Sequence, residues 1–231
     1  GWHDWYLAAN LSENTALDGH LLPGLSPRGV PRHLTESALT FEYNDLAGLE
    51  ALMSSGEVGV IKMEVQRSAE PAKGFLQGVR DLANRHHAVL VFDECTSGFR
   101  ETYGGLHNKF DVQPDIAVFG KALGNGYAIS AVIGRREVMD SAQSSFISST
   151  FWTERVGPSA ALAALKVMRD VKSWDVITEI GLKIRKAWSL AAERQNVSIE
   201  ISGLPSIQSY AFKSSANLEY KTFVTQEMLK S

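Results

Sequence analysis

The sequence predicts an α/β fold with a mostly parallel sheet. Short apolar runs alternate with stretches whose apolar residues recur at helical spacing, the pattern of strand, helix and strand. The run Ala88–Asp93 is apolar until its final carboxylate, which is typical of a strand buried on both faces. With 231 residues, 44% of them apolar, the chain is long enough for one large domain with a sizeable core.

The expected elements follow in chain order. Residues 7–40 hold several Pro and Gly residues and are predicted to be a long loop. Asn44 and Asp45 can cap a helix that ends near Ser54. Pro158 suits the first turn of a later helix. The other expected helices are 74–87, 175–194 and a C-terminal amphipathic segment, and the expected strands are 58–65, 88–93, 116–119, 129–134, 198–201 and 206–212.

The pattern changes beyond residue 135, where long helices replace the alternation of strands and helices. We therefore predict a large domain over residues 1–170 and part of a smaller α+β domain over residues 171–231. Residue 1 is not methionine and the chain stops inside an apparent helix, so we expect a segment of a longer protein.

Composition narrows the classes of partner. A net charge of -3 argues against nucleic acid or an anionic membrane as a partner. The single cysteine excludes an internal disulfide framework and fits a reducing compartment. There is no apolar run long enough for a transmembrane helix and no signal-peptide pattern at the start, so we expect a cytoplasmic protein. We also expect no metal site.

Two residues at strand ends carry the chemical argument. Asp93 closes the run AVLVFD, and Lys121 follows the run DIAVFG directly before a glycine-rich turn. Ligands of open α/β sheets bind beyond the carboxyl ends of the strands, so both side chains can reach one site. Pyridoxal phosphate (PLP) needs both groups, an amine for an imine and a carboxylate that keeps its ring nitrogen protonated. Taken alone, Asp93 could instead be a helix cap or an ion-pair partner, and Lys121 a surface lysine.

An ATPase is a weaker alternative, because an apolar strand ending in Asp93-Glu94 also resembles the acidic motif of phosphate-loop ATPases. The only Gly-Lys pair, Gly120-Lys121, is followed by Ala122 instead of Ser or Thr, and Asp115 stands where the first glycine of the loop belongs.

The stretches FDECTSGFR and QPDIAVFGKALGNGYAISAVIGR resemble the class III aminotransferases, PLP enzymes of fold type I. FEYNDLAGLEALM, the segment from IKMEV to VFDE, and STFWTERVGPSAALAALKVM are similar to glutamate-1-semialdehyde aminomutase and its relatives within that class. The resemblance implies a fold-type-I large domain with helices on both faces of the sheet, followed by the start of a small domain.

The resemblance also implies roles for individual residues. Lys121 would form the imine and move a proton at the substrate's α carbon, and Asp93 would pair with the ring nitrogen of PLP. Cys95 would pack under the ring, and Glu64 would lie near the substrate. Thr150 would reach the cofactor phosphate of a neighbouring subunit, which implies a homodimer with shared active sites; the alternative is a threonine that caps the helix at Pro158.

Two further residues have weaker links to the family pattern. Arg67 could bind a substrate carboxylate through its planar guanidinium, or form a surface ion pair with Glu70. His3 lies just after the place where the family has a ring-stacking aromatic residue, so a packed histidine is expected rather than a catalyst.

The implied reaction is transfer of an amino group between an amino acid or amine and a carbonyl compound. The intramolecular aminomutase reaction stays an alternative, although residues 7–32 share only a Pro-rich end with the aminomutase gating loop. A catalytically inactive relative that serves as a scaffold is the non-enzyme alternative. The family's main phosphate-binding loop would precede residue 1, so we expect this chain by itself to bind PLP weakly or not at all.

Overall fold

The structure is a computed structural model that describes residues 4–20, 23–148, 150 and 153–230. Its described residues form two units, one of residues 1–59 and 72–87 and the other of residues 60–71 and 88–231. The predicted domains, 1–170 and 171–231, stay a prediction.

The first unit is helical. It contains α1 (Asp4–Leu7), α2 (Ala9–Ser12), a 3-10 turn (Arg32–Leu34), α3 (Leu46–Met53) and α4 (Phe75–Arg85). As predicted, Asp45 caps α3, its carboxylate accepting from the Gly48 amide at 2.9 Å. The loop predicted over residues 7–40 is interrupted by α2 and the 3-10 turn.

Helices α3 and α4 pack closely in this unit. A Cβ atom on Gly78 of α4 would lie 2.4 Å from a methyl group of Leu46, so a larger residue there would require the Leu46 side chain to shift. The rings of Tyr43 and Phe75 meet edge to face with centroids 5.1 Å apart. The backbone is left-handed at Gly74, directly before α4, with φ of 81°.

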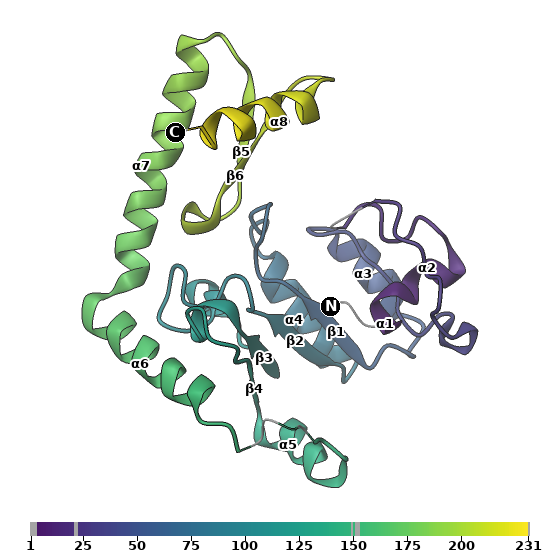
Figure 1. Ribbon diagram of the computed structural model, residues 1–231. Coiled ribbons are helices and arrows are strands. Elements are labelled where there is room, and N and C mark those ends of the chain that lie inside the picture. Colours follow the sequence, from purple (N-terminus) through teal and green to yellow (C-terminus); the bar gives the residue numbers. More distant parts are fainter. Residues whose placement is uncertain (1–3, 21–22, 149, 151–152, 231) are drawn as a thin grey trace. The chain divides into compact units, whose positions relative to one another are not determined.

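The second unit is built around a four-stranded sheet (Figure 1). Its strands are β1 (Val60–Met63), β2 (Val89–Asp93), β3 (Ile116–Phe119) and β4 (Ala131–Gly134), in that order. β1, β2 and β3 are parallel and β4 is antiparallel to β3, which confirms the mostly parallel sheet. β1 is shorter than expected, so Glu64 follows the strand instead of ending it.

The core beside β3 forms where the chain leaves the sheet. Phe99, Ala117, Phe119, Leu123 and Ala161 make one buried cluster, with Leu165 and Met168 packed against it. The segment that carries Lys121 is therefore anchored on both sides, by Phe119 before it and by Leu123 after it.

Long helices follow the sheet, as predicted. They are α6 (Val156–Val171) and α7 (Ser173–Arg194), after the short α5 (Arg136–Met139). A two-stranded antiparallel sheet of β5 (Ile199–Ser202) and β6 (Ser209–Phe212) precedes α8 (Asn217–Met228). Gln208 donates to the Gly181 carbonyl at 2.7 Å and Arg185 to the Gly203 carbonyl at 2.8 Å, which ties the segment between β5 and β6 to α7.

Candidate active site

The carboxyl ends of β2 and β3 lie next to each other, as the sequence predicts. Asp93 pairs in register with Val118, and the Glu94 amide donates to the Val118 carbonyl at 2.8 Å. Lys121 comes three residues after Val118. A Cβ atom on Gly120 would lie 3.2 Å from Cys95 Sγ, so the two segments are in close contact where the strands end.

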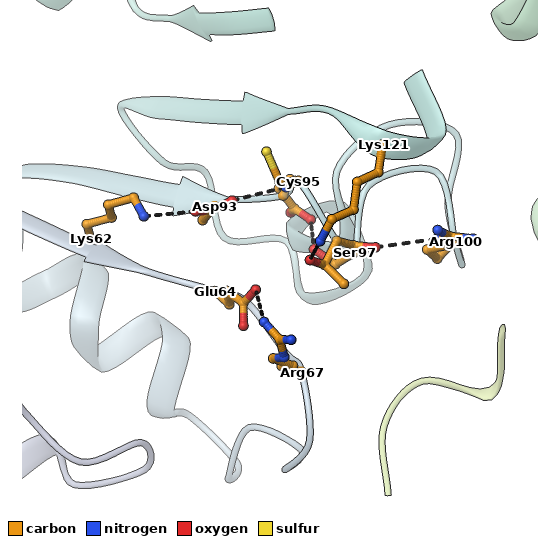
Figure 2. A network of polar contacts seen from close by, with 10 residues as sticks. Lys62, Glu64, Arg67, Asp93, Cys95, Ser97, Arg100 and Lys121 are labelled. Carbon is orange, nitrogen blue, oxygen red and sulfur yellow. Dashed lines mark hydrogen bonds and ion pairs between the residues drawn. The ribbon is translucent and has the colours of Figure 1, made fainter. Parts of the chain in front are cut away.

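Lys121 begins a 3-10 turn (Lys121–Leu123) with a left-handed backbone, φ 44°. Its side chain is exposed, and its amine donates to Thr96 Oγ1, a hydroxyl in the loop after β2. Figure 2 shows the side chain extending from β3 toward this loop. The amine is thus oriented by a neutral hydroxyl and not by a carboxylate.

Asp93 is held by Lys62 and by Cys95. Lys62 Nζ lies 2.8 Å from Asp93 Oδ2, and the Cys95 amide donates to Asp93 Oδ1 at 3.1 Å (Figure 2). Burial raises the pKa of Asp93, but the hydrogen bond and charge of Lys62 and the Cys95 amide together lower it below its ordinary value. The ion-pair alternative for Asp93 is therefore realised, with a lysine from the neighbouring strand.

Glu64 and Arg67 form an ion pair directly after β1. Arg67 Nη1 donates to Glu64 Oε1 at 3.3 Å. Burial raises the pKa of Glu64, and the nearby charge of Asp93 raises it further, whereas Arg67 and Lys121 lower it in part. The charges of Asp93 and Lys121 thus both act on Glu64, and Arg67 is engaged with Glu64.

Cys95 lies between the two strand ends, partly buried. Burial and the neighbouring Asp93 charge raise the pKa of its thiol, so that it stays neutral at physiological pH. A neutral, half-buried thiol is consistent with the predicted packing role and not with redox chemistry.

A buried network that sequence reasoning missed lies behind this edge. Glu94 is fully buried; Oε1 accepts from the His107 amide at 3.0 Å and lies 2.8 Å from His107 Nδ1, and Oε2 accepts from the Ser97 hydroxyl. Burial raises the pKa of Glu94, but these hydrogen bonds lower it below its ordinary value. The network ties the loop of Cys95 and Thr96 to residue 107, and Glu94 in the Asp-Glu pair was its only sequence signal.

Thr150 is exposed in a turn. The alternative that it caps the following helix is wrong, because α6 begins at Val156 and Glu154 accepts hydrogen bonds from the amides of Val156 and Gly157. Its contact with a cofactor phosphate stays a prediction. His3 lies outside the described residues.

A cleft of about 770 Å³ borders the turn at Lys121. Arg100 and Tyr127 contribute polar groups, and α6 contributes small and apolar side chains including Ala164 and Val167. This is enough space for a small organic molecule next to the lysine segment.

The chain is similar to a known protein family and to curated members of that family. The family model described as Aminotransferase class-III matches residues 50–230. The chain is 33% identical over 235 residues to 3-aminobutyryl-CoA aminotransferase of Cloacimonas acidaminovorans (strain Evry), covering 98% of this chain and 53% of the relative. It is 34% identical over 188 residues to glutamate-1-semialdehyde 2,1-aminomutase of Methanothrix thermoacetophila, covering 78% of this chain and 43% of the relative. The chain thus spans about half the length of the curated relatives it matches.

The fold is shared with solved structures. The PLP internal aldimine form of the FumI protein of Sphingopyxis sp. MTA144 superposes with a TM-score of 0.80 over 93% of this chain and 56% of that chain, at 19% identity. At this identity the likeness shows the fold alone, and it confirms the predicted fold type I. The family match also decides against the phosphate-loop ATPase alternative.

Proposed function

Because this chain belongs to the class III aminotransferase family, we propose that its protein transfers an amino group between an amino acid or amine and a carbonyl compound, with PLP as cofactor. When bound, PLP supplies an aldehyde that accepts the amino group and a ring that withdraws electrons from the reacting carbon. The observation that carries the proposal is the placement of an amine, Lys121, and an ionised carboxylate, Asp93, at the neighbouring carboxyl ends of β3 and β2.

The residues present fit such a cofactor. An ionised carboxylate offers about four acceptor positions, so Asp93 can receive the N–H of a protonated ring while it keeps Lys62 and the Cys95 amide. The neutral Cys95 thiol offers a soft surface for the ring face. Lys121 has an exposed amine that is held only by a hydroxyl, so it can reach an aldehyde.

Lys121 has two tasks in this proposal. Its Nζ would hold the cofactor between turnovers, and its free amine would take a proton from the donor's α carbon and deliver it to the carbon of the cofactor that carried the aldehyde. Thr96 Oγ1 keeps the amine on the side of the β2 loop, where Asp93 and Cys95 lie. We place the donor near Glu64, with Arg67 as the candidate for its carboxylate.

The intramolecular aminomutase reaction is the second candidate. The 34% identity to a glutamate-1-semialdehyde 2,1-aminomutase favours it. The greater coverage by an aminotransferase, 98% of this chain, favours transfer between two molecules. A panel of amino donors and carbonyl acceptors that includes glutamate-1-semialdehyde distinguishes the two.

We further propose a cytoplasmic homodimer in which Thr150 reaches the cofactor phosphate bound by the other subunit. The exposure of Thr150 is consistent with this role. Among the residues that the structure describes, no helix is long and apolar enough to cross a membrane.

The deciding experiment uses the complete protein with added PLP. We expect a visible absorption band from the lysine-bound cofactor, and borohydride reduction should attach the cofactor to Lys121, as located by peptide mass spectrometry. Lys121→Ala should abolish both, whereas Lys186→Ala, at an exposed lysine of α7, should change neither. A protein without the band, or one labelled at another lysine, would contradict the proposal and favour an inactive relative.

A further inference from the structure

Lys62 is a lysine in the interior of a short strand of the parallel sheet. It stands in β1 between Ile61 and Met63, which are 3% and 8% exposed, and its own side chain is 30% exposed. Lysines are seldom buried without a partner, and strands of parallel sheets are usually apolar. A lysine at this position is therefore unusual, and its ion pair with Asp93 explains it.

Strand pairing sets this contact. Lys62 pairs in register with Val91, and Asp93 lies two residues further along β2, on the same face of the sheet. In a parallel pair with strands about 4.8 Å apart and a rise of about 3.3 Å per residue, such diagonal neighbours have Cα atoms about 8 Å apart, a distance that a lysine side chain can span. Figure 2 shows the Lys62 side chain extended along the sheet to Asp93, where Nζ lies 2.8 Å from Oδ2.

The contact leaves Asp93 able to bind a ligand. Lys62 occupies one position on Oδ2 and the Cys95 amide occupies one on Oδ1. Both oxygens are therefore held, which fixes the plane of the carboxylate, while each oxygen retains acceptor capacity. The donors leave Asp93 ionised and oriented before any ligand arrives.

We propose that Lys62 is a positioning residue that keeps Asp93 ionised and correctly oriented for the protonated ring nitrogen of PLP. This inference rests on the proposed function, because it assigns Asp93 to the ring nitrogen. A neutral carboxyl group would lose the charge attraction to a protonated ring, so the cofactor would be bound more weakly wherever Asp93 takes up a proton.

The other charged and titratable groups around Asp93 explain why a cation is needed. Glu64 lies within electrostatic range, and its negative charge disfavours an ionised Asp93. Arg67 is paired with Glu64, and the Cys95 thiol is neutral. Lys121 is a further cation in this region, but its amine takes part in the proposed chemistry, whereas Lys62 is paired with Asp93 at 2.8 Å.

The first test measures PLP binding by the complete protein as a function of pH. Lys62→Met removes the charge and keeps the length of the side chain, and Lys62→Arg keeps the charge. Because the pKa of Asp93 lies below its ordinary value in the wild type, PLP affinity should fall only as pH drops through that lowered pKa. We expect this acid limb to lie about one to two pH units higher in Lys62→Met than in the wild type, and Lys62→Arg to stay within a few tenths of a unit of the wild type.

The second test needs no cofactor. We would measure the urea unfolding of the apo-protein against pH for the wild type, Lys62→Met, Asp93→Asn and the double variant. Because Asp93 has a lowered pKa in the folded state, its coupling with Lys62 should be present near neutral pH and vanish as pH falls through that pKa. With Asn at position 93, replacing Lys62 should have an effect that does not depend on pH.

The outcomes separate the two proposals. If the wild type binds PLP and Lys62→Met shows the same acid limb, the inference about Lys62 is wrong while the proposed function stands. If the wild type does not bind PLP, the proposed function fails. If the coupling free energy between Lys62 and Asp93 in the unfolding experiment does not change with pH, the inference about Lys62 fails as well. Circular dichroism of each variant tests whether it is folded. If the acid limb of Lys62→Arg shifts as far as that of Lys62→Met, the result contradicts a role of the charge.

Discussion

The buried carboxylate of Glu94 allows a quantitative prediction. Glu94→Gln keeps the shape of the side chain and removes the charge. The glutamine oxygen can face the His107 amide, and its amide group can donate to Ser97, whose hydroxyl can turn to accept. The hydrogen bonds with His107 and Ser97 then go to a neutral amide instead of a carboxylate. Such bonds stabilise by about 1 kcal/mol less each than bonds to a charged group.

The lowered pKa of Glu94 indicates that these hydrogen bonds outweigh the cost of burying the charge. Part of the lost stabilisation is offset because a neutral amide is buried more cheaply than a carboxylate. We therefore expect Glu94→Gln to lower the free energy of unfolding at pH 7 by about 2–3 kcal/mol. Because Glu94 is fully buried, solvent does not screen these interactions.

The assay is urea unfolding followed by circular dichroism, repeated over a range of pH. The folded pKa lies below that of the unfolded chain, so the contribution of the charge is complete above the unfolded value, about 4.3, and disappears as pH falls through the folded pKa. The matched control is Glu50→Gln, which weakens an exposed pair with Arg85 at 3.0 Å and should change stability by less than about 1 kcal/mol. Equal effects of the two substitutions, or a Glu94 effect that is unchanged in acid, would refute the reasoning.

Three further experiments test contacts of Asp93, Gly78 and Cys95. Asp93→Asn should weaken PLP binding at pH 7 at least about tenfold, because a charged hydrogen bond to the ring is lost, and equilibrium dialysis measures it. Gly78→Ala should lower the free energy of unfolding by up to about 2 kcal/mol, because the cost of crowding Leu46, 2.4 Å from the new Cβ, exceeds the gain of about 1 kcal/mol in helix propensity; a raised urea midpoint would contradict the close packing. Cys95, the single cysteine, should react with iodoacetamide at pH 8 more slowly than free cysteine, because its thiol pKa is raised, and a faster rate would argue for an activated thiol.

Local patterns predicted most of the elements. β3 was expected over residues 116–119 and lies at Ile116–Phe119, and α3 begins at its predicted Asp45 cap. These predictions succeed because apolar runs and capping side chains act on neighbouring residues. Pro158 lies in the first turn of α6, as predicted, and the helix begins two residues earlier, at Val156, where the carboxylate of Glu154 accepts hydrogen bonds from the first amides.

The partners of the charged side chains were less predictable. Arg67 pairs with Glu64, and Glu94 with His107 and Ser97, although residue types alone suggested other partners or none. Glu94 and His107 are 13 residues apart, a separation that leaves no periodic signal in the sequence. Their contact depends on how the loop folds back on the strand that precedes it. The residue pattern around His107 gives no sign of a contact with Glu94.

The sequence by itself determined which segments form strands, and that an acid and an amine, Asp93 and Lys121, follow two of them. The tertiary structure decided what surrounds these two groups. Lys62 and Asp93 are 31 residues apart, and only the register of β1 on β2 brings the ammonium within 2.8 Å of the carboxylate. Register is a property of two paired strands and depends on the packing of the whole sheet, so neither strand's residues specify it alone.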